Sequence, residues 1–194
     1  MSFFKKIFSS KKENVQEPSR LQGVASKEYF ENRYTEQNLS ENKSIVEGSL
    51  KMVESYLIDN DLEPKVKSPI NHPLNLDQLM DDGMGFSLYC NAMQVEEQAM
   101  TLILAFAFSD FLINNFAFKL YKDSTPEYPL RGMTLKYSKD EIVFSLYPYE
   151  YAAKVLNYEA NFNDLYTKIN NQLKNIPSKE ELLGKFMPPE QDEN

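Results

Sequence analysis

Residues 99–118, AMTLILAFAFSDFLINNFAF, form the most apolar stretch of the chain, and their environment decides the fold. A helix that spans a membrane needs about 20 predominantly apolar residues. Apolar side chains extend almost without interruption only from Ala99 to Phe108, and Asp110 follows. An aspartate at the centre of a bilayer costs roughly 2.5–3.5 kcal/mol. We therefore predict a helix over residues 95–115 that is buried on most sides in a protein core.

The residues around this stretch favour a helix over a strand. Glu96 and Glu97 suit the first turn of a helix, where they face the positive end of the backbone dipole. The AFAF alternation inside the stretch is compatible with a strand, but the length favours a helix. No positively charged flank marks an orientation in a membrane.

After the apolar stretch the period of apolar residues changes from 3.6 to two, which is typical of strands with one exposed face. Segments 118–122, 131–137 and 142–147 show this alternation. A connection with two prolines, residues 123–130, and a short polar turn, residues 138–141, separate them. Links this short imply antiparallel neighbours, so the sequence predicts a three-stranded meander.

Amphipathic patterns predict helices on both sides of these strands. Apolar side chains recur near a 3.6-residue period over residues 39–60, and residues 75–80 fit a short helix. Pro148 can open a helix over 149–157, and another is predicted over 161–176. This order gives an α+β fold: a small antiparallel three-stranded sheet packed against a long buried helix, with flanking helices.

The two ends of the chain differ in composition from its middle. Residues 1–38 consist of a basic leader and a polar linker, with a short helix considered around residues 26–34. Residues 178–194 form an acidic tail that contains two adjacent prolines. We predict that both ends are loose. Residues 39–177 then form a single α+β domain, which is long enough to bury a core.

The first twelve residues, MSFFKKIFSSKK, contain four lysines and no acid. Aromatic and apolar side chains on one helical face, with lysines elsewhere, are typical of weak peripheral contact with a membrane surface. The candidate contact residues are Phe3, Phe4, Lys5, Lys6, Ile7 and Phe8. A disordered leader is the alternative, because about ten residues form only a marginal helix in water.

The charge of the chain indicates which class of partner it can bind, and its cysteine content indicates the cell compartment. The formal net charge is −8, from 21 basic and 29 acidic residues. A nucleic-acid binder needs a basic face, and this balance argues against one. The single cysteine, Cys90, allows neither an intrachain disulfide nor a cysteine-based zinc site. This favours a reducing cytoplasm, and a periplasmic protein with few cysteines is the alternative. An acidic body is steered towards a basic protein partner.

No segment carries a specific catalytic or cofactor-binding signature. The sequence lacks a glycine-rich phosphate loop, G-x-S-x-G and H-E-x-x-H. His72 lies in a proline-rich loop, and Asp81-Asp82-Gly83 lacks the spacing of a calcium loop. Asp110 is the best titratable candidate if its side chain is buried. We predict no catalytic residues, no cofactor and no metal site.

Four tyrosines lie close together after the third predicted strand: Tyr147, Tyr149, Tyr151 and Tyr158. Tyrosine is enriched at protein interfaces because it offers a large contact area and a polar tip. The alternative is that some of these rings simply cover the hydrophobic core. The cluster is the candidate protein interface.

Residues 111–176 carry the marks F-K-L-Y, G-M-T-L-K-Y, V-F-S-L-Y-P and F-N-D-L-Y. In this layout the segment resembles a bacterial α+β domain family of unknown function. Small acidic proteins of this kind are often found beside bacterial toxins as immunity proteins. The resemblance therefore implies binding to a toxin, and it carries no catalytic residues.

Three hypotheses for the function follow. The leading one is a non-enzymatic cytoplasmic bacterial protein that binds another protein, as an immunity protein or inhibitor does. The alternative is a membrane-peripheral accessory protein tethered by its basic amphipathic N-terminus. The second alternative is a small-ligand binder or hydrolase that uses Asp110 or the Asp81-Asp82 turn, which a pocket with converging polar groups would support.

Overall fold

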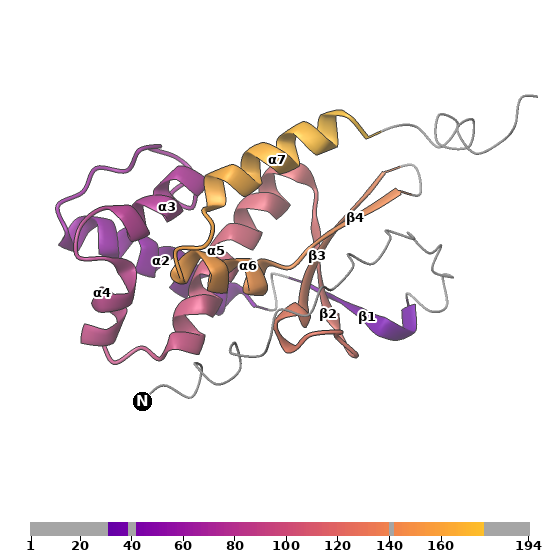
Figure 1. Cartoon of the computed structure of the whole chain (residues 1–194), viewed down its shortest axis with the longest axis horizontal. Helices are drawn as coiled ribbons and strands as arrows, with labels where there is room; N and C mark the ends of the chain where they lie inside the picture. Colours follow the sequence, from indigo (N-terminus) through magenta and orange to yellow (C-terminus); the bar gives the residue numbers. More distant parts are fainter. Residues whose placement is uncertain (1–30, 39–41, 140–141, 177–194) are drawn as a thin grey trace, which may run out of the picture.

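Helices and strands lie largely on opposite sides of the molecule. The computed structural model describes residues 31–38, 42–139 and 142–176. Figure 1 shows most of the helices on one side and the strands on the other. Because the helices lie apart from an antiparallel sheet whose last three strands follow one another in the chain, the fold is α+β, as the sequence predicts.

The described residues form one antiparallel sheet with the strand order β1-β2-β3-β4. Leu135 lies opposite Leu120 on one side and opposite Leu146 on the other, so one face of the sheet is apolar. Three strands correspond to the predicted meander. The bounds are β1 (Tyr34–Gln37), β2 (Lys119–Asp123), β3 (Met133–Lys139) and β4 (Ile142–Leu146).

Strand β1 makes the predicted count of three strands wrong. It lies inside the segment that the sequence suggests is a linker, and its residues, YTEQ, show no apolar alternation. Contacts with β2 hold it in place: Tyr34 lies opposite Asp123, and Arg33 donates to both carboxylate oxygens of Asp123 at 2.7–3.0 Å. This charge-assisted bond lowers the pKa of Asp123 and fixes the edge of the sheet.

The helices follow the predicted order with one addition, the seven-residue helix α4, which begins directly after a bend at Gly83 and Gly85. The other helices lie within a few residues of their predicted ends. A short 3₁₀ turn also precedes β3. The bounds are α2 (Lys43–Asp59), α3 (Pro73–Asp81), α4 (Phe86–Ala92), α5 (Glu97–Phe116), η2 (Pro129–Arg131), α6 (Pro148–Leu156) and α7 (Phe162–Lys174).

Helix α5 contains the apolar stretch and supplies much of the core. It packs mainly against α2 and α6, and its buried residues join Leu120 and Leu135 of the sheet in one hydrophobic cluster. The predicted long helix is therefore present, with more of its contacts to helices than to the sheet. Its buried apolar residues are Met100, Leu104, Ala105, Ala107, Phe108, Phe111 and Leu112.

Among the described residues, α5 is the one helix long and apolar enough to cross a membrane, and 50% of its apolar window is buried inside the fold. The core helix of a globular protein can meet the same criteria. Asp110 is half-buried and accepts a hydrogen bond of 3.0 Å from the Nδ2 of Asn71. The acidic side chain within this helix therefore has a hydrogen-bond partner inside the fold.

Candidate functional site

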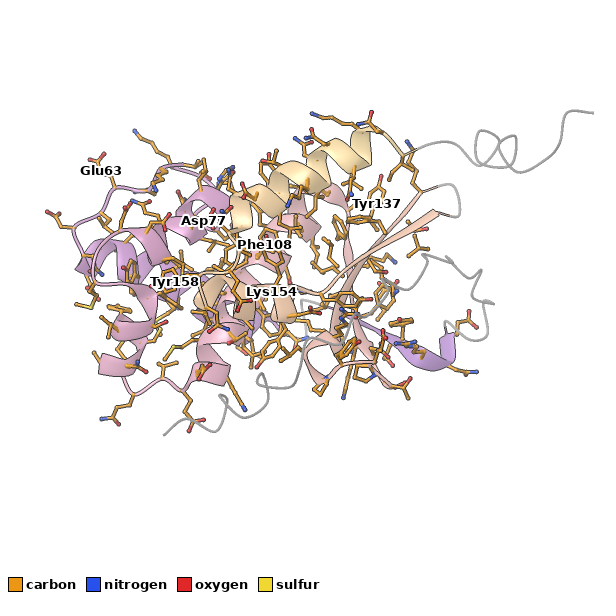
Figure 2. The ribbon with its side chains drawn as sticks, in the orientation of Figure 1. Glu63, Asp77, Phe108, Tyr137, Lys154 and Tyr158 are labelled. Carbon is orange, nitrogen blue, oxygen red and sulfur yellow. The ribbon has the colours of Figure 1, made fainter. Side chains whose placement is uncertain are left out.

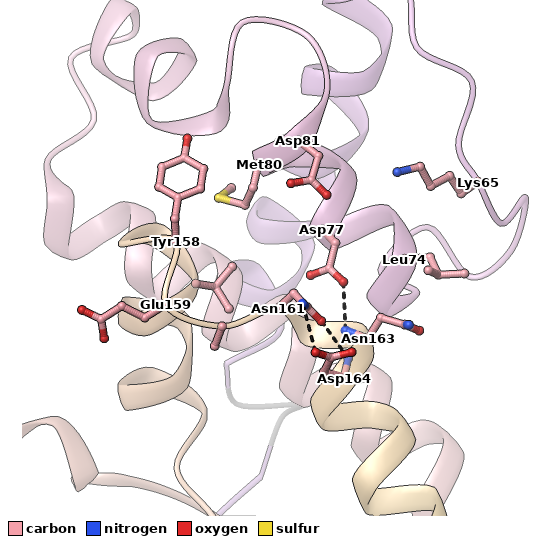
Figure 3. A pocket seen from close by; sticks show the side chains of 12 residues that line it. Lys65, Leu74, Asp77, Met80, Asp81, Tyr158, Glu159, Asn161, Asn163 and Asp164 are labelled. Atoms are coloured by element: carbon pink, nitrogen blue, oxygen red, sulfur yellow. Dashed lines mark hydrogen bonds between the residues drawn. The ribbon is translucent and has the colours of Figure 1, made fainter.

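An open pocket of about 500 Å³ lies between α3, the loop after α6 and the first turn of α7 (Figure 3). The basic residue of its lining, Lys65, has its Nζ 3.5 Å from a carboxylate oxygen of Asp82. The acidic lining residues are Asp77, Asp81, Glu159 and Asp164. The wall thus carries a net negative charge, and we call this site the acidic pocket.

Asp77 joins the two helices that form the acidic pocket. Its side chain is buried on α3, and its two carboxylate oxygens accept from the backbone N–H groups of Phe162 (2.6 Å) and Asn163 (2.9 Å). Burial raises the pKa of Asp77, although the two backbone hydrogen bonds act in the opposite direction. The carboxylate therefore serves as a capping group for α7 that another helix supplies.

The first turn of α7 positions a second carboxylate at the acidic pocket. Asn161 is the N-cap residue, and its Oδ1 accepts from the backbone N–H of Asp164 at 2.9 Å. The Nδ2 of Asn161 donates to the carboxylate of Asp164 at 3.2 Å. These reciprocal bonds hold the Asp164 side chain beside the helix terminus, as the dashed lines in Figure 3 show.

Tyr158 stands at the rim of the acidic pocket with 71% of its surface exposed. Its backbone φ is +58°, a left-handed conformation that bulky residues rarely adopt. Backbone hydrogen bonds from Tyr158 to Val155 and from Glu159 to Lys154 close the turn that follows α6. This turn presents an aromatic face and the exposed Glu159 carboxylate to solvent together.

The four tyrosines of the candidate protein interface do not share one surface patch. Tyr147 and Tyr151 are half-buried in the lining of a second pocket, and Tyr149 packs half-buried against the core. Only Tyr158 of the four is largely exposed. Figure 2 shows its side chain at the same end of the molecule as Asp77.

The reactive groups singled out in the sequence have structural contacts in the fold. The Nδ1 of His72 accepts from the backbone N–H of Leu74 at 3.2 Å and so caps α3, while burial lowers the pKa of this histidine. Cys90 is buried, which raises its pKa to about 11. Within the described ranges, no three or more His, Cys, Asp or Glu side chains converge in a way that could hold a metal ion.

Sequence reasoning missed most of the acidic pocket. Asp81 was considered in the Asp81-Asp82 turn, as a poor match to a calcium loop and as part of a small-ligand or hydrolase site, while Asp77, Glu159 and Asp164 gave no functional signal. The spacing of Asn161 and Asp164 is that of an N-terminal cap, which marks the helix start. The contact between Asp77 and Phe162 joins residues 85 positions apart, which no local pattern reveals.

Comparison with known proteins gives no relative. No family model, no curated protein and no solved structure matches the chain. The resemblance of residues 111–176 to a bacterial domain family therefore stays a prediction. The candidate membrane-contact residues, Phe3 to Phe8, lie outside the described residues, as do residues 178–194 of the predicted acidic tail.

Replacing Asp77 with asparagine should lower the free energy of unfolding by about 2 kcal/mol, because the new amide keeps one acceptor and points an NH2 group at a backbone donor. Urea denaturation monitored by circular dichroism measures this loss. The same substitution at the exposed Asp81 is the control and should change stability by less than about 0.5 kcal/mol. Equal effects at both positions would show that the Asp77 carboxylate does not cap α7.

Proposed function

We propose that the protein binds another protein without catalysing a reaction, and that the acidic pocket receives a basic side chain of that partner. The observation that carries this proposal is the combination of carboxylates and an exposed aromatic ring around one open cavity. Lysine or arginine is attracted to both, through Coulombic interaction with the acids and through the negative face of the tyrosine ring.

Asp81, Glu159 and Tyr158 supply the contacts that such a side chain would make first. All three are exposed and line the same pocket, and no ion pair joins either acid to another residue of the described chain. Asp77 and Asp164 already hold the first turn of α7. Their negative charge still adds to the potential in the pocket, so the inner wall favours a cation as well.

The charge of the whole chain supports an encounter with a basic protein. A net charge of −8 would speed association with a positively charged partner at low ionic strength. A bacterial cytoplasmic immunity protein or inhibitor directed against a basic toxin fits this description. The sequence resemblance of residues 111–176 favours the same class of function.

A binding role also agrees with how the titratable side chains are used. The His72 ring and the Asp77 carboxylate both accept hydrogen bonds from helix N-termini, and the Cys90 thiol is buried. Groups that hold the fold in this way are poorly placed to contact a substrate. These contacts support a protein that recognises a partner by shape and charge.

Charge reversal in the acidic pocket should weaken the complex about 100-fold. The partner is captured from a lysate of the source cells at low salt and purified, and its affinity is then measured by calorimetry. The pocket variant combines Asp81→Lys with Glu159→Lys. Affinity should also fall as salt rises, because the attraction is electrostatic.

A control variant with the same change in net charge distinguishes contacts inside the acidic pocket from the long-range attraction exerted by the whole protein. Glu47 and Glu54 are exposed on α2 and do not line the acidic pocket. Replacing both with lysine should weaken the complex only about threefold, through slower association. A partner that binds both double variants equally well, or with no dependence on salt, would refute the proposed site.

A further inference from the structure

An exposed apolar patch adjoins the acidic pocket at the bend between α3 and α4. It consists of Met84, Leu88 and Tyr158, each of which is more than half exposed. Met84 lies in the bend itself, and Leu88 lies on the first turn of α4. Large apolar side chains that gather on one surface mark contact sites, whereas scattered ones do not. We call these three residues the bend patch.

Tyr158 joins the bend patch to the acidic pocket. A Cβ atom added to Gly85 would lie 3.9 Å from the Tyr158 hydroxyl oxygen, so the ring reaches from the turn after α6 to the start of α4. Gly85 directly follows Met84 and precedes the helical turn that carries Leu88. The same tyrosine ring lines the acidic pocket (Figure 3). Apolar and acidic groups therefore form one continuous surface.

The backbone beneath the bend patch is held by α2. The backbone N–H of Met84 donates to the Oδ1 of Asn60 at 3.1 Å, and that of Gly85 donates to the hydroxyl oxygen of Tyr56 at 2.9 Å. Tyr56 belongs to α2, and Asn60 is its C-cap residue. A surface that is fixed in this way before binding loses little conformational entropy when a partner docks on it.

The elements around the bend patch limit how a partner segment can bind. The described elements there are the ends of α3, α4 and α6 and the turns between them, so they offer no strand edge for an extended segment to pair with. A helix instead binds through side chains three or four positions apart on one face. Such a helix can place apolar side chains on the bend patch and a lysine or arginine in the acidic pocket at once.

We propose that the bend patch and the acidic pocket together bind a basic amphipathic helix of the partner protein. This inference rests on the proposed function and adds the kind of segment that the partner supplies. The apolar face of the helix covers the bend patch, where the flexible Met84 side chain adapts to its shape. Its cations contact Asp81 and Glu159, and the same two carboxylates repel an acidic helix of the same apolar pattern.

Two synthetic peptides test whether apolar contact adds to the attraction between charges. The first is a Leu–Lys peptide with its leucines at three- and four-residue helical spacing, and the second is oligolysine with the same number of lysines. Fluorescence anisotropy measures the affinity of each labelled peptide at low salt. The Leu–Lys peptide should bind about tenfold more tightly than oligolysine, because only its leucines can cover the bend patch.

Substitutions in the bend patch locate the apolar contact. Met84→Gln combined with Leu88→Gln should weaken binding of the Leu–Lys peptide about tenfold and leave the affinity for oligolysine unchanged. The control combines Ile45→Gln with Leu130→Gln, at exposed positions on α2 and η2 outside the lining of the acidic pocket, and should change neither affinity. Equal losses in both double variants, or a Leu–Lys peptide that binds no more tightly than oligolysine, would overturn the inference.

The pocket variant, Asp81→Lys with Glu159→Lys, separates this inference from the proposed function. It should weaken the binding of both peptides about tenfold or more, because both depend on the carboxylates. If this variant loses oligolysine while the wild-type protein gains nothing from the leucines, the acidic pocket receives cations but the amphipathic helix is refuted. If the variant binds oligolysine as tightly as the wild-type protein does, the acidic pocket receives no cation and the proposed function fails as well.

Discussion

Replacing Gly83 with alanine is expected to lower the free energy of unfolding by roughly 3 kcal/mol. Gly83 has a φ of +70°, where a side chain is strained. The added methyl group would also lie 2.8 Å from the Oδ1 of Asn60 and 2.9 Å from the hydroxyl oxygen of Tyr56. Backbone strain and steric overlap would therefore act together at this position.

Neither neighbour of Gly83 can move away without losing hydrogen bonds. The buried Tyr56 hydroxyl donates to the carbonyl of Asp82 and accepts from the backbone N–H of Gly85. The Asn60 side chain donates to the carbonyl of Tyr56 and accepts from the backbone N–H of Met84. These bonds fix the bend between α3 and α4, so the cost of the methyl group cannot be relieved locally.

Gly48→Ala is the matched control, and its effect should have the opposite sign. Gly48 is exposed within α2, and nothing lies within 4 Å of the position of an added Cβ. Alanine there should stabilise the protein by about 0.5–1 kcal/mol, because glycine loses more backbone entropy in a helix. Both variants are measured by urea denaturation. A loss below about 1 kcal/mol for Gly83→Ala would mean that the bend adjusts to a side chain.

These two glycines also illustrate what the sequence can and cannot predict. Glycine next to an acidic pair is a local turn signal, and Gly83 and Gly85 have positive φ angles in the bend between α3 and α4. A glycine inside a helix can mark a point of close packing, but no neighbour lies within 4 Å of the position of an added Cβ at Gly48. Whether a helical glycine faces a neighbour or solvent depends on tertiary contacts that its own helix does not encode.

Elements with a clear period were predictable, and short elements that depend on partners were not. Alternating apolar residues located β2, β3 and β4, whereas the polar strand β1 forms through its pairing with β2 and the Arg33–Asp123 ion pair. Helix α4 has only seven residues, too few for a 3.6-residue period to emerge. Its burial of Phe86 and Tyr89 against α2 shows why it forms.

The same distinction explains the candidate sites. The sequence shows that the segment after β4 is rich in tyrosine. In the fold, however, Tyr147 and Tyr151 line one pocket, and Tyr158, beyond the end of α6, lines another. Assembly of the acidic pocket requires α3 and α7, whose contact joins distant parts of the chain. A sequence pattern identifies residue types that suit a function, while the fold decides which of them meet.

The second large loss of stability is expected from shortening a buried leucine of helix α5. This substitution tests whether the apolar stretch is packed in a protein core. Leu104 is completely buried, and Leu104→Ala should lower the free energy of unfolding by about 3 kcal/mol, because it removes transfer energy and leaves a cavity. Urea denaturation in the absence of detergent measures this loss. A cost below about 1 kcal/mol would mean that this face of α5 is not packed against the core.

Leu102 is the matched position on the same helix, with 41% of its surface exposed. Leu102→Lys should change stability by no more than about 0.5 kcal/mol, because a long charged side chain can reach solvent from an exposed helical position. If lipid covered this face, the lysine would cost about 2.5–3.5 kcal/mol near the bilayer centre. Stable, detergent-free Leu102→Lys protein beside destabilised Leu104→Ala would therefore place α5 in a protein core. The reverse pattern would place its exposed face against lipid.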